Sequence, residues 1–172
     1  MGNEYKMRQQ IPDDLVKDAA EQFMSGWKLL EQNIIPGSGL LLPFINTGTL
    51  VIELYLKCLS SKVIHTPEGQ IKDMYIVTAA PQKSGHNLCN IFKKIPESYK
   101  VEMQQAYAST YDDESRKFED ILRTLEGAFM DSRYSYETDR NIDKYSLKDL
   151  KNICEFLSKY VTNLKVKETI DC

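Results

Sequence analysis

The hydrophobic positions of the chain repeat mostly with the period of an α-helix. Residues 12–33 carry one apolar stripe, from Leu15 through Phe23 to Leu30, that predicts an amphipathic helix. Residues 44–62 are apolar on nearly every side, which indicates a central helix surrounded by others. Further helices are predicted at 84–95, 97–110, from 118 onward, and after residue 146.

Residues 63–80 break this helical pattern. β-Branched residues there flank a Pro-Glu-Gly turn, which predicts a short β-hairpin insertion. The tail after Leu164 is expected to be frayed. Ser146 and Asp149 form a capping-box pattern before the last helix. The predicted fold is therefore all-α, an up-and-down helical bundle of five to six helices within a single domain over residues 1–172.

Composition narrows the class of protein without identifying a function. The chain has 42% hydrophobic and 27% charged residues, as soluble globular proteins do. A net charge of −3 excludes a chain-wide basic surface for nucleic acid, although a local basic patch remains open. No signal peptide and no apolar run of membrane-spanning length are found, so no membrane association is expected. The four cysteines lack framework spacing, which favours free thiols and a cytoplasmic location.

Three charged clusters interrupt the most apolar segments. They are Glu53 with Lys57, His86 in a Gly-His-Asn-Leu turn, and Arg133 with Glu137. An ionised side chain in the interior must be paired or coordinated to be tolerated. All three clusters are expected to face the interior and to converge on one site.

Arg133 is the cation of this expected site. If the helix that begins near residue 118 continues, Arg133 projects from the same stripe as Phe129 and needs a carboxylate or an anionic ligand. Glu53 is the expected partner, because Glu137 follows Arg133 in the weaker order for a helical ion pair. The alternative is that Arg133 caps a helix end beside a polar loop.

His86 has two interpretations as well. Near the first turn of a helix, its imidazole and the free backbone amides favour a bound anion. The alternative is a histidine that holds the loop by bonding a backbone carbonyl. A zinc site made of Cys58, His65, His86 and Cys89 is not favoured, because the spacing is unlike that of a zinc finger. Neither a metal nor a cofactor is expected.

Three motifs in order, ELYLKCL, GHNLCNIF and RYSYE, resemble the HEPN family of small helical domains. The resemblance covers about residues 12–162 and implies a helical bundle that often forms homodimers. It also implies RNA cleavage, RNA binding or nucleotide binding, in many members within bacterial toxin-antitoxin or antiviral systems. A nucleotidyltransferase or antitoxin is the protein partner that such a system implies.

One departure from that family changes the expected activity. The family's ribonucleases use an Arg followed four to six residues later by a His, whereas Arg133 is followed by Tyr134-Ser135-Tyr136-Glu137. The only histidines are His65 and His86, so the standard ribonuclease site is not encoded.

Three hypotheses remain. The first is a non-nuclease module that binds RNA, a nucleotide or a protein partner, and its expected ligand-binding residues are Glu53, Lys57, His86, Asn87, Arg133 and Tyr134. The second is a divergent, metal-independent endoribonuclease in which Glu137 or His86 transfers the proton beside Arg133. The third is an interaction protein in which the charged clusters form only a buried polar network.

Overall fold

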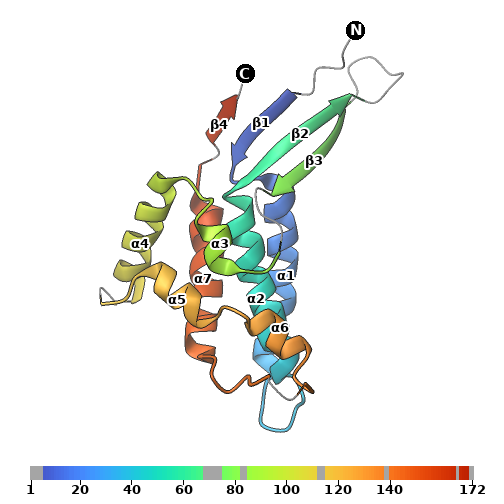
Figure 1. The fold of residues 1–172 in the computed structure, drawn as a ribbon, viewed down its shortest axis with the longest axis vertical. Coiled ribbons are helices and arrows are strands. Elements are labelled where there is room, and N and C mark those ends of the chain that lie inside the picture. The colour runs from blue at the N-terminus through green and yellow to red at the C-terminus, as the bar shows by residue number, and fades with distance from the viewer. Residues whose placement is uncertain are drawn as a thin grey trace.

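The computed structural model describes residues 6–67, 75–81, 85–111, 115–137, 140–165 and 167–170 of the chain. Within them, seven helices and four short strands are formed (Figure 1). The helices are α1 (Asp14–Asn33), α2 (Leu41–Cys58), α3 (Leu88–Phe92), α4 (Glu97–Tyr111), α5 (Phe118–Thr124), α6 (Ala128–Arg133) and α7 (Leu147–Asn163). The strands are β1 (Lys6–Ile11), β2 (Ser61–Pro67), β3 (Tyr75–Pro81) and β4 (Lys167–Ile170). The predicted helical bundle with a β-hairpin is confirmed.

Helix α2 is the centre of the bundle, as its apolar sequence predicted. It packs against α1, α3, α6 and α7, and ten of its 18 residues are buried. By length and composition α2 could also cross a membrane, a criterion that the core helix of a bundle meets too. The expectation that no segment reaches membrane-spanning length therefore does not hold for this helix.

Local capping signals set the starts of the two long outer helices. Asp13 precedes α1, and its side chain accepts a hydrogen bond from the Val16 amide at 3.1 Å. Ser146 likewise accepts from the Asp149 amide at 3.1 Å, as predicted, and α7 follows. The predicted stripe of α1 is confirmed in part: Trp27 is buried and Val16 and Leu30 pack against the core. Leu15 and Phe23 are instead exposed, and Ala20 and Met24 are buried.

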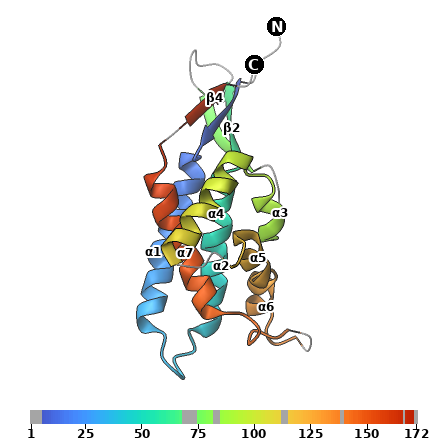
Figure 2. The same ribbon diagram turned by 90° about the vertical axis from the view of Figure 1, so that its left-hand side faces the viewer.

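The sheet contains more strands than the sequence predicted. The expected hairpin is present as β2 and β3, with Lys62 opposite Ala80 and Ile64 opposite Thr78. Strands β1 and β4 complete the order β3-β2-β1-β4, so the tail expected to fray instead pairs with β1. The pairings of β1 with β2 and of β1 with β4 join segments that lie far apart in the sequence, and the local hydrophobic pattern does not predict them. Figures 1 and 2 show this sheet beyond one end of the helical bundle.

Three predicted helices have different bounds in the structure. The helix predicted at 84–95 is the shorter α3, which follows its N-cap Asn87. Helix α2 ends at Cys58 rather than near residue 62, because Ser61 already belongs to β2. The helix predicted from residue 118 through Arg133 is broken into α5 and α6. The break occurs at Gly127, whose φ of 88° is left-handed and cannot continue an α-helix. This break decides where the side chains of α6 point.

Candidate functional site

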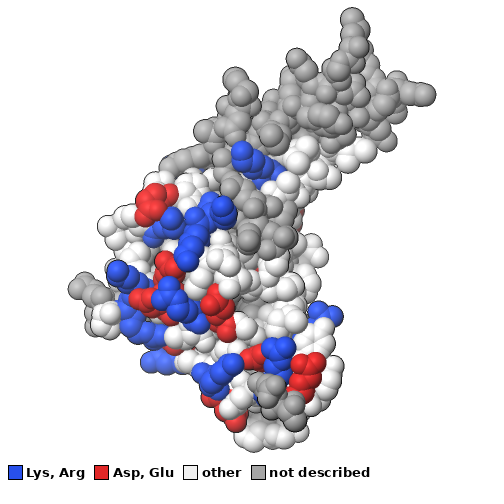
Figure 3. Space-filling model, in the orientation of Figure 1, with Lys and Arg blue, Asp and Glu red and all other residues white. Residues whose placement is uncertain are grey.

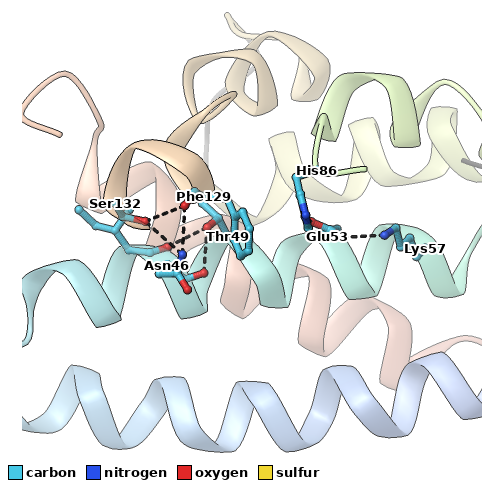
Figure 4. A network of polar contacts seen from close by, with 8 residues as sticks. Asn46, Thr49, Glu53, Lys57, His86, Phe129 and Ser132 are labelled. Atoms are coloured by element: carbon cyan, nitrogen blue, oxygen red, sulfur yellow. Dashed lines mark hydrogen bonds and ion pairs between the residues drawn. The ribbon is translucent and has the colours of Figure 1, made fainter. Parts of the chain in front are cut away.

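One face of α2 carries the polar side chains of the candidate site. Asn46, Thr49, Glu53 and Lys57 follow one another at spacings of three and four residues, which places them on the same side of the helix. Figure 4 shows this row, with α6 facing its first half and His86 facing Glu53. Thr49 uses its hydroxyl within the helix, donating to the carbonyl of Ile45 at 2.9 Å. Asn46 and Glu53 contact residues outside α2, and Lys57 pairs with Glu53 one turn away in the same helix.

Glu53 is the buried charge of the site. Its side chain is only 3% exposed, and each carboxylate oxygen has its own partner. Oε1 accepts from Nζ of Lys57 at 2.6 Å, and Oε2 lies 2.7 Å from Nδ1 of His86. The helical ion pair of Glu53 and Lys57 thus forms as the sequence predicted, and His86 supplies the second partner that a buried carboxylate requires.

His86 is held in place on two sides. An ionised carboxylate only accepts hydrogen bonds, so in the contact with Glu53 the Nδ1 atom carries the hydrogen. The imidazole also stacks on the ring of Phe129, with centroids 4.2 Å apart and planes at 21°. The alternative of a loop-holding bond to a backbone carbonyl is not what the described contacts show. With Nδ1 occupied and the side chain 45% exposed, Nε2 is the atom left for a ligand.

Asn87, the next predicted ligand residue, has a structural contact. It is the N-cap of α3, and its side chain accepts from the amide of Asn90 at 2.7 Å. The side chain oxygen is therefore engaged by the helix, while the residue itself is exposed at the surface.

Arg133 does not reach Glu53, and the expected ion pair between them is wrong. The helix break at Gly127 gives α6 its own direction. Arg133 is the last residue of α6 and is exposed. The guanidinium carbon lies 5.9 Å from the ring centroid of Phe129 and 5.8 Å from that of Tyr134. Within the described part of the chain, no carboxylate lies at ion-pair distance from Arg133. The structure instead agrees with the alternative prediction, in which Arg133 lies at the end of a helix.

Glu137 lies apart from the buried cluster. Its side chain is 48% exposed and accepts from Nε of Arg140 at 3.3 Å. The expectation that all three clusters face the interior is therefore correct only for Glu53 and Lys57. His86 joins these two residues, Arg133 reaches them only through the ring of Phe129, and Glu137 makes no described contact with them.

Two polar clusters around α6 were not predicted. Nδ2 of Asn46 donates to the carbonyl of Phe129 at 3.0 Å, which ties α2 to α6 (Figure 4). Asp131, only 6% exposed, accepts from Arg140 at 2.8 Å and from Tyr145 at 2.5 Å, and its other neighbour Lys144 lies at 2.8 Å. A single amide within apolar α2 was the only sequence signal for the first cluster, and none marked the second.

The ionisation of Asp131 reflects these contacts. Burial alone would raise the pKa of this carboxyl, but hydrogen bonds from Lys144, Tyr145 and Arg140 favour the charged form and lower the pKa to about 2. Burial and the neighbouring carboxylate raise the pKa of Tyr145 to about 12. Asp131 is thus ionised at neutral pH. Its two cationic partners, Arg140 and Lys144, both belong to the segment that follows α6, so the carboxylate holds this segment in place.

Several rings lie near Arg133 at α6: those of His86 and Tyr136 are exposed, and those of Phe129 and Tyr134 are partly buried. We call His86, Phe129, Arg133, Tyr134 and Tyr136 the aromatic–arginine surface. Tyr134 and Tyr136 contact each other edge-on, with centroids 6.2 Å apart, and Tyr136 is 79% exposed. The guanidinium of Arg133 contacts the rings of Phe129 and Tyr134; His86 stacks on the first of these rings, and Tyr136 contacts the second edge-on. Such an arrangement can accept flat ligands between or beside the rings.

The cysteines and histidines do not gather into a metal site among the residues that the structure describes. Cys58 and Cys89 are buried, and burial raises the pKa of each thiol. The side chain of His65 lies outside the described residues. The candidate site is consequently described by its carboxylate, imidazole, guanidinium and aromatic rings.

No family model, curated protein or solved structure matches this chain. The HEPN resemblance therefore remains a prediction from three short motifs. The function has to be inferred from the chemistry of the site itself.

Proposed function

We propose that this chain is a HEPN-like helical module that binds single-stranded RNA or a nucleotide on the aromatic–arginine surface without cleaving it. The observation that carries the proposal is the row of exposed and partly buried rings around Arg133, an arginine that has no carboxylate partner among the described residues. Proteins bind single-stranded RNA by stacking unpaired bases on such rings and on guanidinium planes.

The rings supply the stacking part of the interaction. Tyr136 is 79% exposed and contacts Tyr134 edge to face, so most of its ring is accessible to a ligand. Each base stacked on an aromatic side chain contributes about 1–3 kcal/mol to binding, with little dependence on base identity. Such a surface favours RNA with unpaired bases over a duplex.

Arg133 supplies the contact to phosphate. A guanidinium presents several donors in a plane, which suits a phosphate group bound by two hydrogen bonds. The face in Figure 3 carries Lys and Arg interspersed with Asp and Glu rather than a broad basic field. Binding is therefore expected to depend on stacking and one or two phosphate contacts, with a shallow dependence on salt.

A second function, a divergent metal-independent ribonuclease, is favoured by one contact. The buried carboxylate of Glu53 orients His86 through Nδ1 and leaves Nε2 as a proton acceptor. A carboxylate that holds an imidazole in this way is a common arrangement for a general base. Glu137 has less support as the base, because it is exposed and paired with Arg140. The toxin-antitoxin setting and a nucleotidyltransferase or antitoxin partner belong to the same HEPN-based proposal.

The binding proposal is tested with fluorescently labelled oligonucleotides and the full chain. We expect saturable fluorescence anisotropy changes with single-stranded RNA and weaker ones with duplex RNA of the same sequence. Arg133→Ala and Tyr136→Ala should each weaken binding about tenfold or more, since each removes one stacking or phosphate contact. Arg123→Ala is the matched control, because Arg123 is 55% exposed on α5 and paired with Asp120. Equal effects of Arg133→Ala and Arg123→Ala would contradict the proposal.

The ribonuclease alternative is tested by incubating the same RNA with excess protein and resolving the products on a gel. Cleavage that persists with a chelator and is lost in both His86→Ala and Glu53→Gln would replace the binding proposal with this alternative. Intact RNA under conditions in which binding is saturated would exclude the alternative.

A further inference from the structure

Strand β3 forms one outer edge of the four-stranded sheet. It pairs with β2 on one side, and the sheet order β3-β2-β1-β4 leaves its other side unpaired among the described strands. An unpaired edge presents a row of backbone N–H and C=O groups that can template another strand. In Figures 1 and 2 the sheet lies beyond one end of the bundle, away from most of the helices.

The sequence of β3 lacks the charged side chains that protect an edge, and its one proline, Pro81, stands at the very end of the strand. Folded proteins shield exposed strand edges with charged side chains, above all lysine. The opposite edge strand, β4, has the sequence KETI with two charges, whereas β3 has the sequence YIVTAAP with none. Ile76 is 50% exposed and Val77 is 44% exposed. Because successive side chains of a strand point to opposite faces, both faces of β3 present an exposed apolar side chain.

We propose that the outer edge of β3 pairs with β3 of a second copy of this chain, antiparallel and centred on Thr78. In this register Thr78 lies opposite Thr78 of the second copy, Val77 opposite Ala79, and Ile76 opposite Ala80. Each large side chain thus meets a small one, and the central threonine pair is a favourable cross-strand pair. The two four-stranded sheets become one continuous sheet.

The self-complementary side chains favour a second copy over a different protein. Because β3 carries no charge, two copies of it can pair without electrostatic repulsion. For the same reason, β3 offers no charge that would select a charged strand of a different protein. The large-to-small complementarity around Thr78 arises from the sequence of β3 alone. A different protein would have to match it independently.

The size of the contact sets the expected affinity. Pairing two short strands buries less surface than the roughly 1,200–2,000 Å² typical of stable complexes, so a dissociation constant in the micromolar range is expected. Sedimentation equilibrium of the full chain over roughly 1–300 µM covers that range. We expect a reversible monomer–dimer equilibrium. A chain that is monomeric throughout that range would overturn the proposal.

A lysine on the edge should abolish the dimer. Val77→Lys places a charge in the interface, and Val101→Lys is the matched control, because Val101 is 49% exposed on α4. We expect monomers for Val77→Lys and wild-type association for Val101→Lys. Association of Val77→Lys with wild-type affinity would overturn the proposal.

A charge exchange at Thr78 separates loss of pairing from loss of folding. Thr78→Lys and Thr78→Glu each place like charges opposite themselves at the centre of the interface, so each alone should be monomeric. Mixed in equal amounts, the two variants should form a heterodimer, because lysine then lies opposite glutamate. Two monomeric variants that fail to associate on mixing would overturn the pairing centred on Thr78, since a misfolded strand could not be rescued in this way.

Discussion

Oε2 of the buried Glu53 lies 2.7 Å from Nδ1 of His86, and this contact joins residues 33 positions apart in the chain. It gives the buried carboxylate a second partner beside Lys57. It also fixes the imidazole against the ring of Phe129, the residue through which Arg133 reaches the cluster. This one contact thus links the buried carboxylate of the core to the geometry of the proposed binding surface.

Glu53→Gln tests the buried ion pair. An amide of nearly the same shape loses the charge-assisted contacts with Lys57 and His86, so we expect the free energy of unfolding to fall by about 1–3 kcal/mol. Urea denaturation followed by circular dichroism measures this change. The control is Glu97→Gln, which breaks a pair with Lys100 where the carboxylate is 77% exposed and should change stability by less than about 0.5 kcal/mol. An equal loss of unfolding free energy at the two positions would mean that burial does not make the contacts of Glu53 more stabilising.

Arg133→Ala should leave the fold intact. Arg133 is exposed and forms no described ion pair, so we expect its loss to change the free energy of unfolding by less than about 0.5 kcal/mol. Thermal and urea denaturation measure this. The hypothesis of a buried polar network that includes Arg133 instead requires a loss of several kcal/mol, as for a broken buried ion pair.

Asp131 should make the protein acid-sensitive. Its pKa is about 2 in the folded chain and 3.8 ordinarily, so the folded state binds the proton less well than the unfolded state. The stabilisation is complete above about pH 5 and is lost as the pH falls through 4 towards 2, by about 2 kcal/mol in total. Asp131→Asn should therefore lower stability near pH 7 and much less near pH 2. Denaturation curves at both pH values measure this.

Asp120→Asn is the control for that measurement. Asp120 also pairs with an arginine, Arg123, but is 53% exposed, so its substitution should matter little at either pH. If Asp131→Asn and the wild-type chain lost stability in parallel between pH 7 and pH 2, Asp131 would not be the group responsible.

Gly127→Ala tests the break between α5 and α6. Gly127 has a φ of 88°, and an added Cβ would lie 3.1 Å from the hydroxyl oxygen of Tyr145. We expect a loss of about 1–2 kcal/mol in the free energy of unfolding. Gly26→Ala is the matched control, because Gly26 lies within α1 and an added Cβ would meet no atom within 4 Å. There alanine should stabilise the chain by up to about 1 kcal/mol. A stabilising Gly127→Ala would show that the break does not depend on glycine.

The sequence by itself determined what depends on short spacing. A segment that is apolar on nearly every side places α2 at the centre, because a helix with so little polar surface needs other helices around it. Glu53 and Lys57 pair because residues four apart in a helix are neighbours. Ser146 starts α7 because its side chain satisfies a free amide one turn away. Each of these relations lies within a few residues of chain.

Only the tertiary structure decided which distant groups meet. The left-handed Gly127 ended a stripe that seemed continuous, so Arg133 lies at the surface and His86 takes its place beside Glu53. The same holds for Asp131 with Arg140, and for β1 with β4 at the two ends of the chain. Helical periodicity fixes which side of a helix a residue occupies, but the direction of the next helix depends on one backbone angle and on packing across the whole core.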